Sequence, residues 1–159
     1  MKTVVNLTVN GDPSEIMIES DWTLLQALRS LGLMGAREGC GVGECGACTV
    51  LIKDAKGSRT VNSCLMLAGE AEGAEVTTIE GLADGDEMHP MQEAFRQNHG
   101  LQCGYCTPGM VMAAVSLLDE IPHPTEREVR EGLEGNLCRC TGYHNIVLSV
   151  LDCAEKAGR

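Results

Sequence analysis

The grouping of the cysteines constrains this chain more than any other feature, because eight of the nine fall into two tight sets. The first set consists of Cys40, Cys45, Cys48 and Cys64, and the second set consists of Cys103, Cys106, Cys138 and Cys140. Four thiolates are the number that either a structural zinc ion or a 2Fe-2S cluster takes. The sequence therefore predicts two metal centres in a chain of 159 residues.

The first set reads C-x4-C-x2-C with a remote fourth cysteine, which is the spacing of plant-type 2Fe-2S ferredoxins. Structural zinc sites more often use two short C-x2-4-C pairs. Glycines 41, 43 and 46 lie between these cysteines and let backbone amides turn toward sulfur. They also match G-x-G-x-x-G, but no strand precedes this segment and no helix follows it, as a dinucleotide site requires. The spacing favours an iron-sulfur centre.

In the second set, each short cysteine pair stands before a predicted helix. Cys103 and Cys106 precede Thr107-Pro108, whereas Cys138 and Cys140 precede Thr141-Gly142. Helix N-termini present free amides and favour an anionic group such as a cluster. From the residues alone, zinc and a C-x2-C redox dithiol remain alternatives, because this spacing matches no ferredoxin pattern.

The first eighty residues alternate polar and apolar side chains in short runs separated by turns. Residues 5–9 and 16–18 predict a hairpin, and Ser20 or Asp21 is expected to cap a helix whose apolar face is Leu24, Leu25, Leu28 and Leu31. Residues 49–53 and 59–62 predict a second hairpin, and residues 75–79 predict one more strand. The pattern indicates a small α+β unit.

After residue 80 the pattern changes to the period of helices. Pro90 begins one segment and Thr107 begins another, while Thr125 with Glu128 forms a capping box for a third. The last helix is expected from about Asn145. We therefore predict two units, residues 1–80 and residues 81–159.

Composition excludes several classes of partner. The formal net charge is −11 and no cluster of Lys or Arg is present, so neither nucleic acid nor an anionic membrane is an expected partner. The first residues do not form a signal peptide, and no apolar run reaches the ~18 residues of a membrane span. The cytoplasm, where thiols stay reduced, is the expected compartment.

Four segments together carry a resemblance to a known family. They are GCGVGECGACTV at 39–50, NSC at 62–64, LQCGYCTPGM at 101–110 and GNLCRCTGY at 135–143. The chain resembles the small iron-sulfur subunit of the molybdenum hydroxylases. This family includes xanthine dehydrogenase, aldehyde oxidoreductase, carbon monoxide dehydrogenase and enzymes acting on nicotinate, quinoline and hydroxybenzoyl-CoA.

The resemblance implies an α+β chain with an N-terminal β-grasp ferredoxin-like domain and an all-α four-helix domain, each holding one 2Fe-2S cluster. It further implies a large partner subunit with the molybdopterin cofactor, a medium partner subunit with FAD, and a dimer of such heterotrimers. The second set would lie nearest molybdenum, with Gln102 and Cys140 at positions that touch the pterin. The first set would lie toward the flavin, so that the small subunit passes single electrons between its partners.

Two positions refine this resemblance. Gly41-Val42-Gly43 replaces the Asp-Thr-Ser that small subunits of carbon monoxide dehydrogenases tend to have, which favours the xanthine and N-heterocycle branch. His144 stands where glutamine is frequent, but no ligand is changed. Membership of a carbon monoxide or aldehyde dehydrogenase is the alternative within the family.

The remaining chemistry-bearing residues have plainer interpretations. Cys153 borders the apolar face of the last helix and is expected to be a buried thiol. The histidines share no spacing and are expected to be structural or exposed; they are His89, His99, His123 and His144. Tyr105 and Arg139, inside the cysteine loops, are expected to pack over a cluster.

Catalytic motifs are missing from the sequence. It shows neither a nucleophile paired with a base nor a P-loop, so catalysis is expected in partner subunits. A free-standing two-cluster carrier and a zinc-stapled interaction module are the competing functions.

Overall fold

The computed structural model describes residues 1–158, which form a mixed α/β structure that begins with a hairpin. Strands β1 (Lys2–Val9) and β2 (Asp12–Glu19) pair antiparallel. Asn10 and Gly11 join them with φ of 52° and 87°. Positive φ at both central residues is the geometry of a type I′ turn, which matches the twist of a hairpin. The predicted hairpin is confirmed.

Helix α1 (Leu24–Ser30) follows the hairpin and buries Leu24, Leu25 and Leu28 as expected. Leu31, expected on the same face, is exposed instead, because the helix ends before it and it is the C-cap. The predicted cap was wrong, since neither Ser20 nor Asp21 caps the helix. Thr23 does, because its hydroxyl accepts from the Gln26 amide at 3.3 Å while the Gln26 side chain accepts from the Thr23 amide at 2.8 Å. A threonine and a glutamine three residues apart form a reciprocal capping box.

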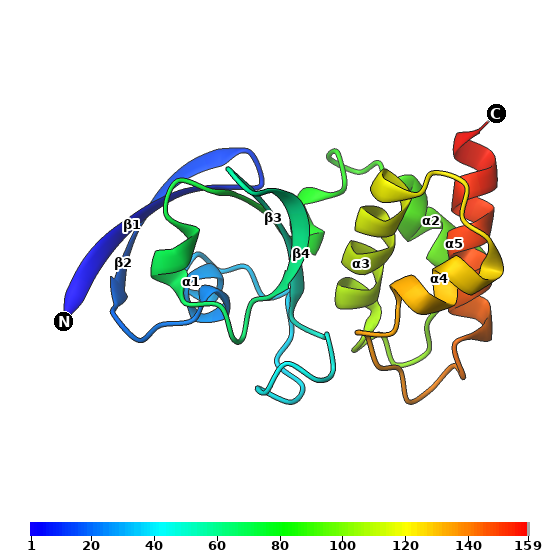
Figure 1. The fold of residues 1–159 in the computed structure, drawn as a ribbon, viewed down its shortest axis with the longest axis horizontal. Coiled ribbons are helices and arrows are strands. Elements are labelled where there is room, and N and C mark those ends of the chain that lie inside the picture. The colour runs from blue at the N-terminus through cyan, green and yellow to red at the C-terminus, as the bar shows by residue number, and fades with distance from the viewer. Residues whose placement is uncertain (159) are drawn as a thin grey trace.

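The sheet is completed by strands β3 (Thr49–Asp54), β4 (Gly57–Asn62) and β5 (Glu75–Thr77). Its order is β2-β1-β5-β3-β4, with β1 and β5 parallel and the other neighbours antiparallel. Two short 3-10 helices, η1 (Ala68–Ala71) and η2 (Ile79–Gly81), flank β5. Figure 1 shows the strands curving about α1, which fills the concave side.

The helical part contains α2 (Pro90–Gln97), α3 (Thr107–Glu120), α4 (Glu126–Gly132) and α5 (His144–Ala157). The capping box of Thr125 and Glu128 at α4 is confirmed by bonds of 2.7 Å and 3.3 Å. Helix α3 begins at Thr107, as predicted, with Cys106 at its N-cap, whereas Tyr143 is the N-cap of α5. Only one of the two cysteine pairs therefore lies directly at the start of a helix.

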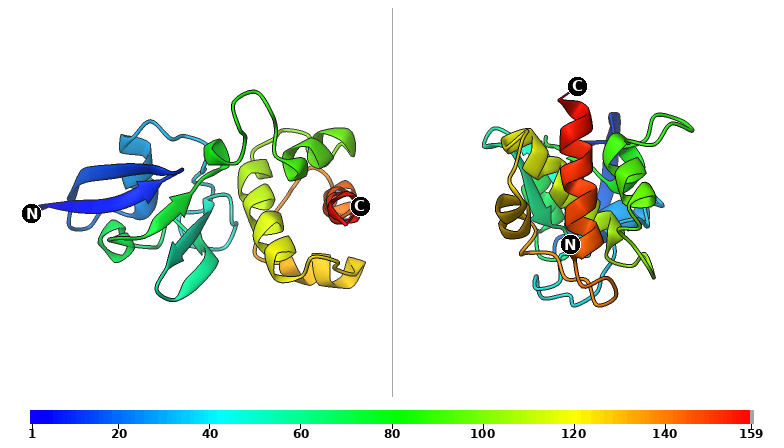
Figure 2. Two further views of the ribbon diagram at one scale, coloured as in Figure 1. Left: turned by 90° about the horizontal axis from the view of Figure 1, so that it is seen from above. Right: turned by 90° about the vertical axis from the view of Figure 1, so that its right-hand side faces the viewer.

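Apolar side chains form two buried clusters along the chain. One is built on the sheet and α1 from residues between 5 and 76, and the other lies among the four helices from residues between 91 and 153. Helix α3 contacts β3 and β4 as well as α2 and α4, so Met112 and Ala113 are buried in addition to Met110, Val111 and Ala114. As Figure 2 shows, α3 thus joins the sheet to the other helices.

Over the described residues, no helix combines the length and apolar character needed to cross a bilayer.

Candidate metal centres

The two cysteine sets lie in loops that project from the same side of the molecule. In Figure 1 the loop of residues 36–48, in cyan, and the loop of residues 133–143, in orange, both extend below the body of the structure, and the right-hand view of Figure 2 shows them together. The structure therefore brings together segments that are about ninety residues apart in the sequence, as the hydrogen bond between Gly46 and Asn136 also shows.

In the first set, backbone amides surround the sulfur of Cys40. The N–H groups of Val42, Glu44 and Cys45 lie 3.5, 3.3 and 3.4 Å from its Sγ. These amide bonds, led by that of Val42, lower the pKa of Cys40 to about 6. Hydrogen bonds to the charged form favour the thiolate, so this exposed sulfur is ready to bind a metal near neutral pH.

The glycines of this loop permit the wrapping that the sequence predicts. Gly41, Gly43 and Gly46 have φ of 67°, 80° and 70°, backbone angles that residues with a side chain rarely adopt. A Cβ atom on Gly39 would lie 2.9 Å from the sulfur of Cys45. Larger residues would therefore either strain the loop or press on the sulfur of Cys45.

Two further thiols of the first set, those of Cys48 and Cys64, are buried, and their environment differs from that of Cys40. Burial raises the pKa of Cys64 to about 11, and a hydrogen bond with the Cys48 thiol adds to the shift. A buried thiolate needs a compensating cation. Cys48 and Cys64 therefore suit a bound metal, whose positive charge replaces the proton.

The second set repeats this division into an exposed and a deeper pair. Cys140 donates to the sulfur of Cys103 across 3.5 Å, and both residues are exposed. Cys106 and Cys138 lie deeper, and a hydrogen bond with Cys138 adds to the burial that raises the pKa of Cys106 to about 12. Tyr105 donates its amide to Cys103 at 3.5 Å and lowers the pKa of that thiol.

Cys138 is the deep thiol with a lowered pKa. Burial acts to raise the pKa, but hydrogen bonds from the Thr141 hydroxyl and from nearby backbone amides outweigh burial. The Thr141 Oγ1 atom lies 3.1 Å from Cys138 Sγ. Cys140 has its pKa raised, chiefly because its thiol donates to Cys103.

The arrangement of thiols in pairs fits a 2Fe-2S cluster, because each of its two irons takes two cysteine thiolates. Within residues 1–158, no three His, Cys, Asp or Glu side chains are placed to share a single metal ion. Each cysteine set instead supplies one deep pair and one pair nearer the surface. The donor set, the amides aimed at sulfur and the glycine-rich wrapping all suit an anionic cluster.

Direct hydrogen bonds connect the two loops. The Leu137 amide donates to the carbonyl of Cys45 at 2.9 Å, and the buried Asn136 side chain donates to the carbonyl of Gly46 at 3.0 Å. Each bond joins a residue of one cysteine loop to a residue of the other. Gly109 of α3 packs so tightly that a Cβ atom there would overlap the Gly46 carbonyl. The relative placement of the two sets is therefore fixed by backbone contacts.

Tyr105 contacts residues of the first cysteine loop. Its hydroxyl donates to the carbonyl of Glu38 at 2.7 Å, and the Arg37 guanidinium lies 5.3 Å from its ring centre. Arg37 also donates to the Gly104 carbonyl at 3.3 Å. Tyr105 thus ties the second cysteine loop to the first.

Other residues singled out in the sequence are placed as follows. Gln102 is exposed beside Cys103, and the contact between Cys103 and Cys140 brings Gln102 and Cys140 to the same surface. Cys153 is buried in the helical cluster, and burial raises the pKa of its thiol. His89 accepts from the Met91 amide at 3.1 Å and caps α2. Arg139 and the remaining histidines are exposed; these are His99, His123 and His144.

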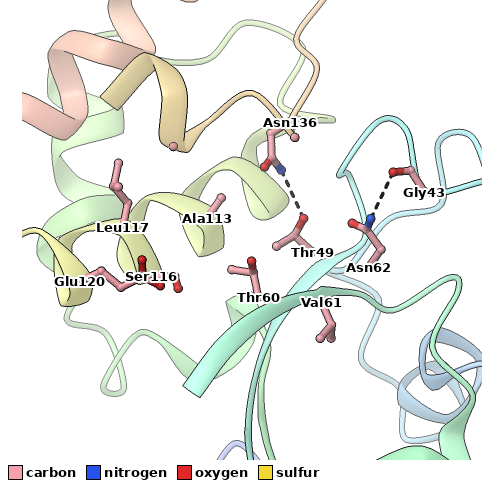
Figure 3. Close-up of a pocket in the computed structure, with 12 residues that line it drawn as sticks. Gly43, Thr49, Thr60, Val61, Asn62, Ala113, Ser116, Leu117, Glu120 and Asn136 are labelled. Atoms are coloured by element: carbon pink, nitrogen blue, oxygen red, sulfur yellow. Dashed lines mark hydrogen bonds between the residues drawn. The ribbon is translucent and has the colours of Figure 1, made fainter. Parts of the chain in front are cut away.

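A cavity of about 370 Å³ lies between the sheet and α3. Figure 3 shows Thr49 and Thr60 of the sheet on one side of it and Ala113 and Ser116 of α3 on the other. Its wall carries Asn136 bonded to Thr49 at 3.3 Å, while Asn62 bonds the Gly43 carbonyl at 3.2 Å. The cavity is therefore part of the contact between the sheet and the helices.

Sequence reasoning missed Asn136, Thr141 and Tyr143 as residues of the site. Asn136 and Thr141 lie within the GNLCRCTGY segment, so their proximity to Cys138 and Cys140 was visible, but the hydrogen bonds that they form depend on folding. Tyr143 donates its amide to Thr141 Oγ1 at 3.1 Å, and its hydroxyl accepts from the Cys138 amide at 3.0 Å.

Comparison with known proteins gives matches over nearly the whole chain. A 2Fe-2S iron-sulfur cluster binding domain family matches residues 7–76, and a [2Fe-2S] binding domain family matches residues 78–151. The chain is 44% identical to the xanthine dehydrogenase iron-sulfur-binding subunit of Escherichia coli O157:H7, covering 95% of this chain and 94% of that protein. It is 45% identical to the nicotine 6-hydroxylase small subunit of Paenarthrobacter nicotinovorans, covering 97% and 91%.

Among solved structures, a chain of quinoline 2-oxidoreductase from Pseudomonas putida 86 is similar, with a TM-score of 0.92 and 45% identity. The match covers 99% of this chain and 97% of that one. Both the fold and the two cysteine loops therefore fall within the matched region.

Proposed function

The chain belongs to the family of small iron-sulfur subunits of molybdenum hydroxylases, and on that premise we propose which residues hold its clusters and which surfaces face its partners. It is an electron-transfer subunit of a multi-subunit oxidoreductase. When bound, its two 2Fe-2S clusters supply one-electron redox chemistry. Catalysis belongs to a partner subunit.

The ligands that we propose are the two complete cysteine sets. One cluster is held by Cys40, Cys45, Cys48 and Cys64, and the other is held by Cys103, Cys106, Cys138 and Cys140. The paired thiols and the amides aimed at Cys40 and Cys103 support this assignment. Cys153 is left out because it lies in the apolar cluster of the helices.

We also propose the finer division of the fold. Residues 1–80 form a β-grasp ferredoxin-like domain and residues 81–159 form an all-α four-helix domain. The two separate apolar clusters support this division, as do the two family matches, which meet between residues 76 and 78.

The observation that carries the proposed electron transfer is that each set has exposed thiols while the loops touch through Leu137 and Cys45. The exposed thiols are Cys40 in the first set and Cys103 with Cys140 in the second. Large apolar side chains also lie in or beside the cysteine loops with 39% to 63% exposed. They are Val42, Leu65, Leu101, Tyr105 and Leu137. Exposed apolar groups around a site indicate a protein contact surface.

The surface with Gln102, Cys103 and Cys140 is the one we assign to the large molybdopterin-binding subunit. The Gln102 amide can hydrogen-bond the edge of a heterocycle, and a ligand sulfur can accept from an amino group. The surface with Cys40 and Val42 is then assigned to a medium subunit with FAD. The chain thus presents one cluster to each partner.

The assembly that we propose is a dimer of heterotrimers in the cytoplasm. All nine cysteines are free in the described residues, which suits a reducing compartment. The substrate class proposed for the holoenzyme is an N-heterocycle, because relatives named for xanthine, nicotine and quinoline match over almost the full chain.

Native purification tests this proposal. The chain is expressed in its native host with a small affinity tag. The eluted complex is analysed by size-exclusion chromatography and assayed for iron, molybdenum and flavin. We expect co-elution of two larger subunits carrying molybdenum and FAD. A single small iron-sulfur species would instead support a free-standing carrier, and zinc without acid-labile sulfide would contradict both electron-transfer functions.

A further inference from the structure

We propose that Thr141 is a positioning residue that sets the reduction potential of the cluster in the second set, by donating a hydrogen bond from its hydroxyl to the sulfur of Cys138. The inference rests on the proposed function, because it takes Cys138 as a cluster ligand. The contact spans 3.1 Å between Thr141 Oγ1 and Cys138 Sγ. Hydrogen bonds to ligand sulfur are one of the means by which proteins set cluster potentials.

The direction of this hydrogen bond follows from its neighbours. A cysteine bound to iron is a thiolate and has no proton to give, so the hydroxyl of Thr141 must be the donor. The same oxygen accepts the Tyr143 amide at 3.1 Å. With one lone pair occupied in that way, the hydroxyl proton is free to point at sulfur.

The bond also stands out from the other contacts to sulfur in the two sets. Backbone amides lie 3.3 to 3.5 Å from Cys40, Cys45 and Cys103. The Thr141 hydroxyl is nearer to its sulfur, and Cys138 is buried, so the surroundings weaken the bond less than water would. Unlike an amide, the hydroxyl can be removed by substitution.

Tyr143 holds this arrangement in place from the start of α5. Its hydroxyl accepts from the Cys138 amide at 3.0 Å, and its own amide donates to Thr141. Its φ is 69°, an uncommon conformation for a bulky residue. The backbone of Cys138 and the side chain of Thr141 are therefore anchored to one residue, which fixes the hydroxyl against the sulfur.

The effect on potential has a definite sign. A cluster gains negative charge when it accepts an electron, so a donor at a ligand sulfur stabilises the reduced form more than the oxidised form. Removing the hydroxyl should make reduction of the second cluster about tenfold less favourable, which for a one-electron couple is a fall of about 59 mV. The first cluster should not change.

The experiment is a redox titration of the purified complex followed by electron paramagnetic resonance, which measures each cluster separately. Thr141→Val removes the hydroxyl at nearly constant volume, and Thr141→Ala removes it with less volume if valine hinders cluster loading. Thr141→Ser keeps the hydroxyl and is the matched control. Pulsed electron-nuclear double resonance should show a proton near the second cluster that is lost on exchange from H₂O into D₂O. The valine or alanine variant should lack this proton.

We expect a lowered potential for the second cluster in the valine or alanine variant, and a near-native potential in the serine variant. An unchanged potential without the hydroxyl, or an equal fall in the serine variant, would overturn the role of Thr141. Those results leave the proposed function intact. Finding only one cluster in the native protein would overturn the proposed function itself.

Discussion

Gly109 of α3 offers the sharpest test of how the helices meet the first cysteine loop. Replacing glycine by alanine inside a helix normally stabilises it by about 1 kcal/mol. Here the added Cβ would overlap the carbonyl oxygen of Gly46 and lie 3.2 Å from the backbone of Ala47. Backbone atoms cannot rotate away, so α3 must move from the loop, and overpacking of this kind costs about 3 kcal/mol.

Gly109→Ala is therefore expected to lower the free energy of unfolding by about 2 kcal/mol. For a chain of this size that corresponds to a fall of about 4–8 °C in melting temperature. The displacement should also weaken the bonds of Gly46 to Asn136 and of Cys45 to Leu137, which join the two loops. Magnetic interaction between the clusters should weaken as a result.

Gly135→Ala is the matched control, because Gly135 lies beside the same contact but a Cβ there would meet no atom within 4 Å. Both variants are compared in the loaded complex by thermal unfolding and by electron paramagnetic resonance. The free energy of unfolding of the control variant should stay within about 0.5 kcal/mol of that of the native protein. Equal melting temperatures for the two alanine variants would refute the close approach of α3 to Gly46.

Three further results are expected. Cys64→Ser should abolish the signal of the first cluster only, whereas Cys153→Ser should retain both; loss of a cluster in the latter would contradict the ligand assignment. In metal-free protein, the rate at which Cys40 reacts with iodoacetamide should be half-maximal near pH 6, since its pKa is about 6. Cys64, with a pKa of about 11, should react slowly. Equal rates for the two thiols, measured by peptide mass spectrometry, would contradict the amide-bonded environment of Cys40 and the buried environment of Cys64. The Asp54 carboxylate accepts two bonds of 2.9 Å from Arg59, and its pKa is lowered to about 2. Its stabilising effect should be complete above about pH 4 and lost as pH falls through about 2, and Asp54→Asn should differ from the native protein in acid unfolding only above that range.

Local patterns predicted much of the fold. The alternation in residues 5–9 and the capping box of Thr125 and Glu128 each depend on neighbours in the sequence, and each was confirmed. The cap of α1 was missed because Ser20 and Asp21 are also good capping residues. The bond between Thr23 and Gln26 decided the boundary.

The candidate site was predictable in its residue types but not in its connections. Spacing alone indicated an iron-sulfur centre for the first set, while the second set needed the family resemblance to exclude zinc and a dithiol. The burial of both sides of α3, the bond from Asn136 to Gly46 and the role of Tyr105 all depend on contacts between distant segments. Such contacts leave no periodic signal in one sequence.

The central claim, that each cysteine set holds its own 2Fe-2S cluster, is tested most directly by spin quantification of the reduced complex. The account predicts two distinct signals of one spin each per small subunit, with four irons and four acid-labile sulfides. Cys48→Ser should remove one signal and Cys106→Ser should remove the other. A single signal in the native complex, or loss of both signals from either substitution with the fold retained, would contradict the claim.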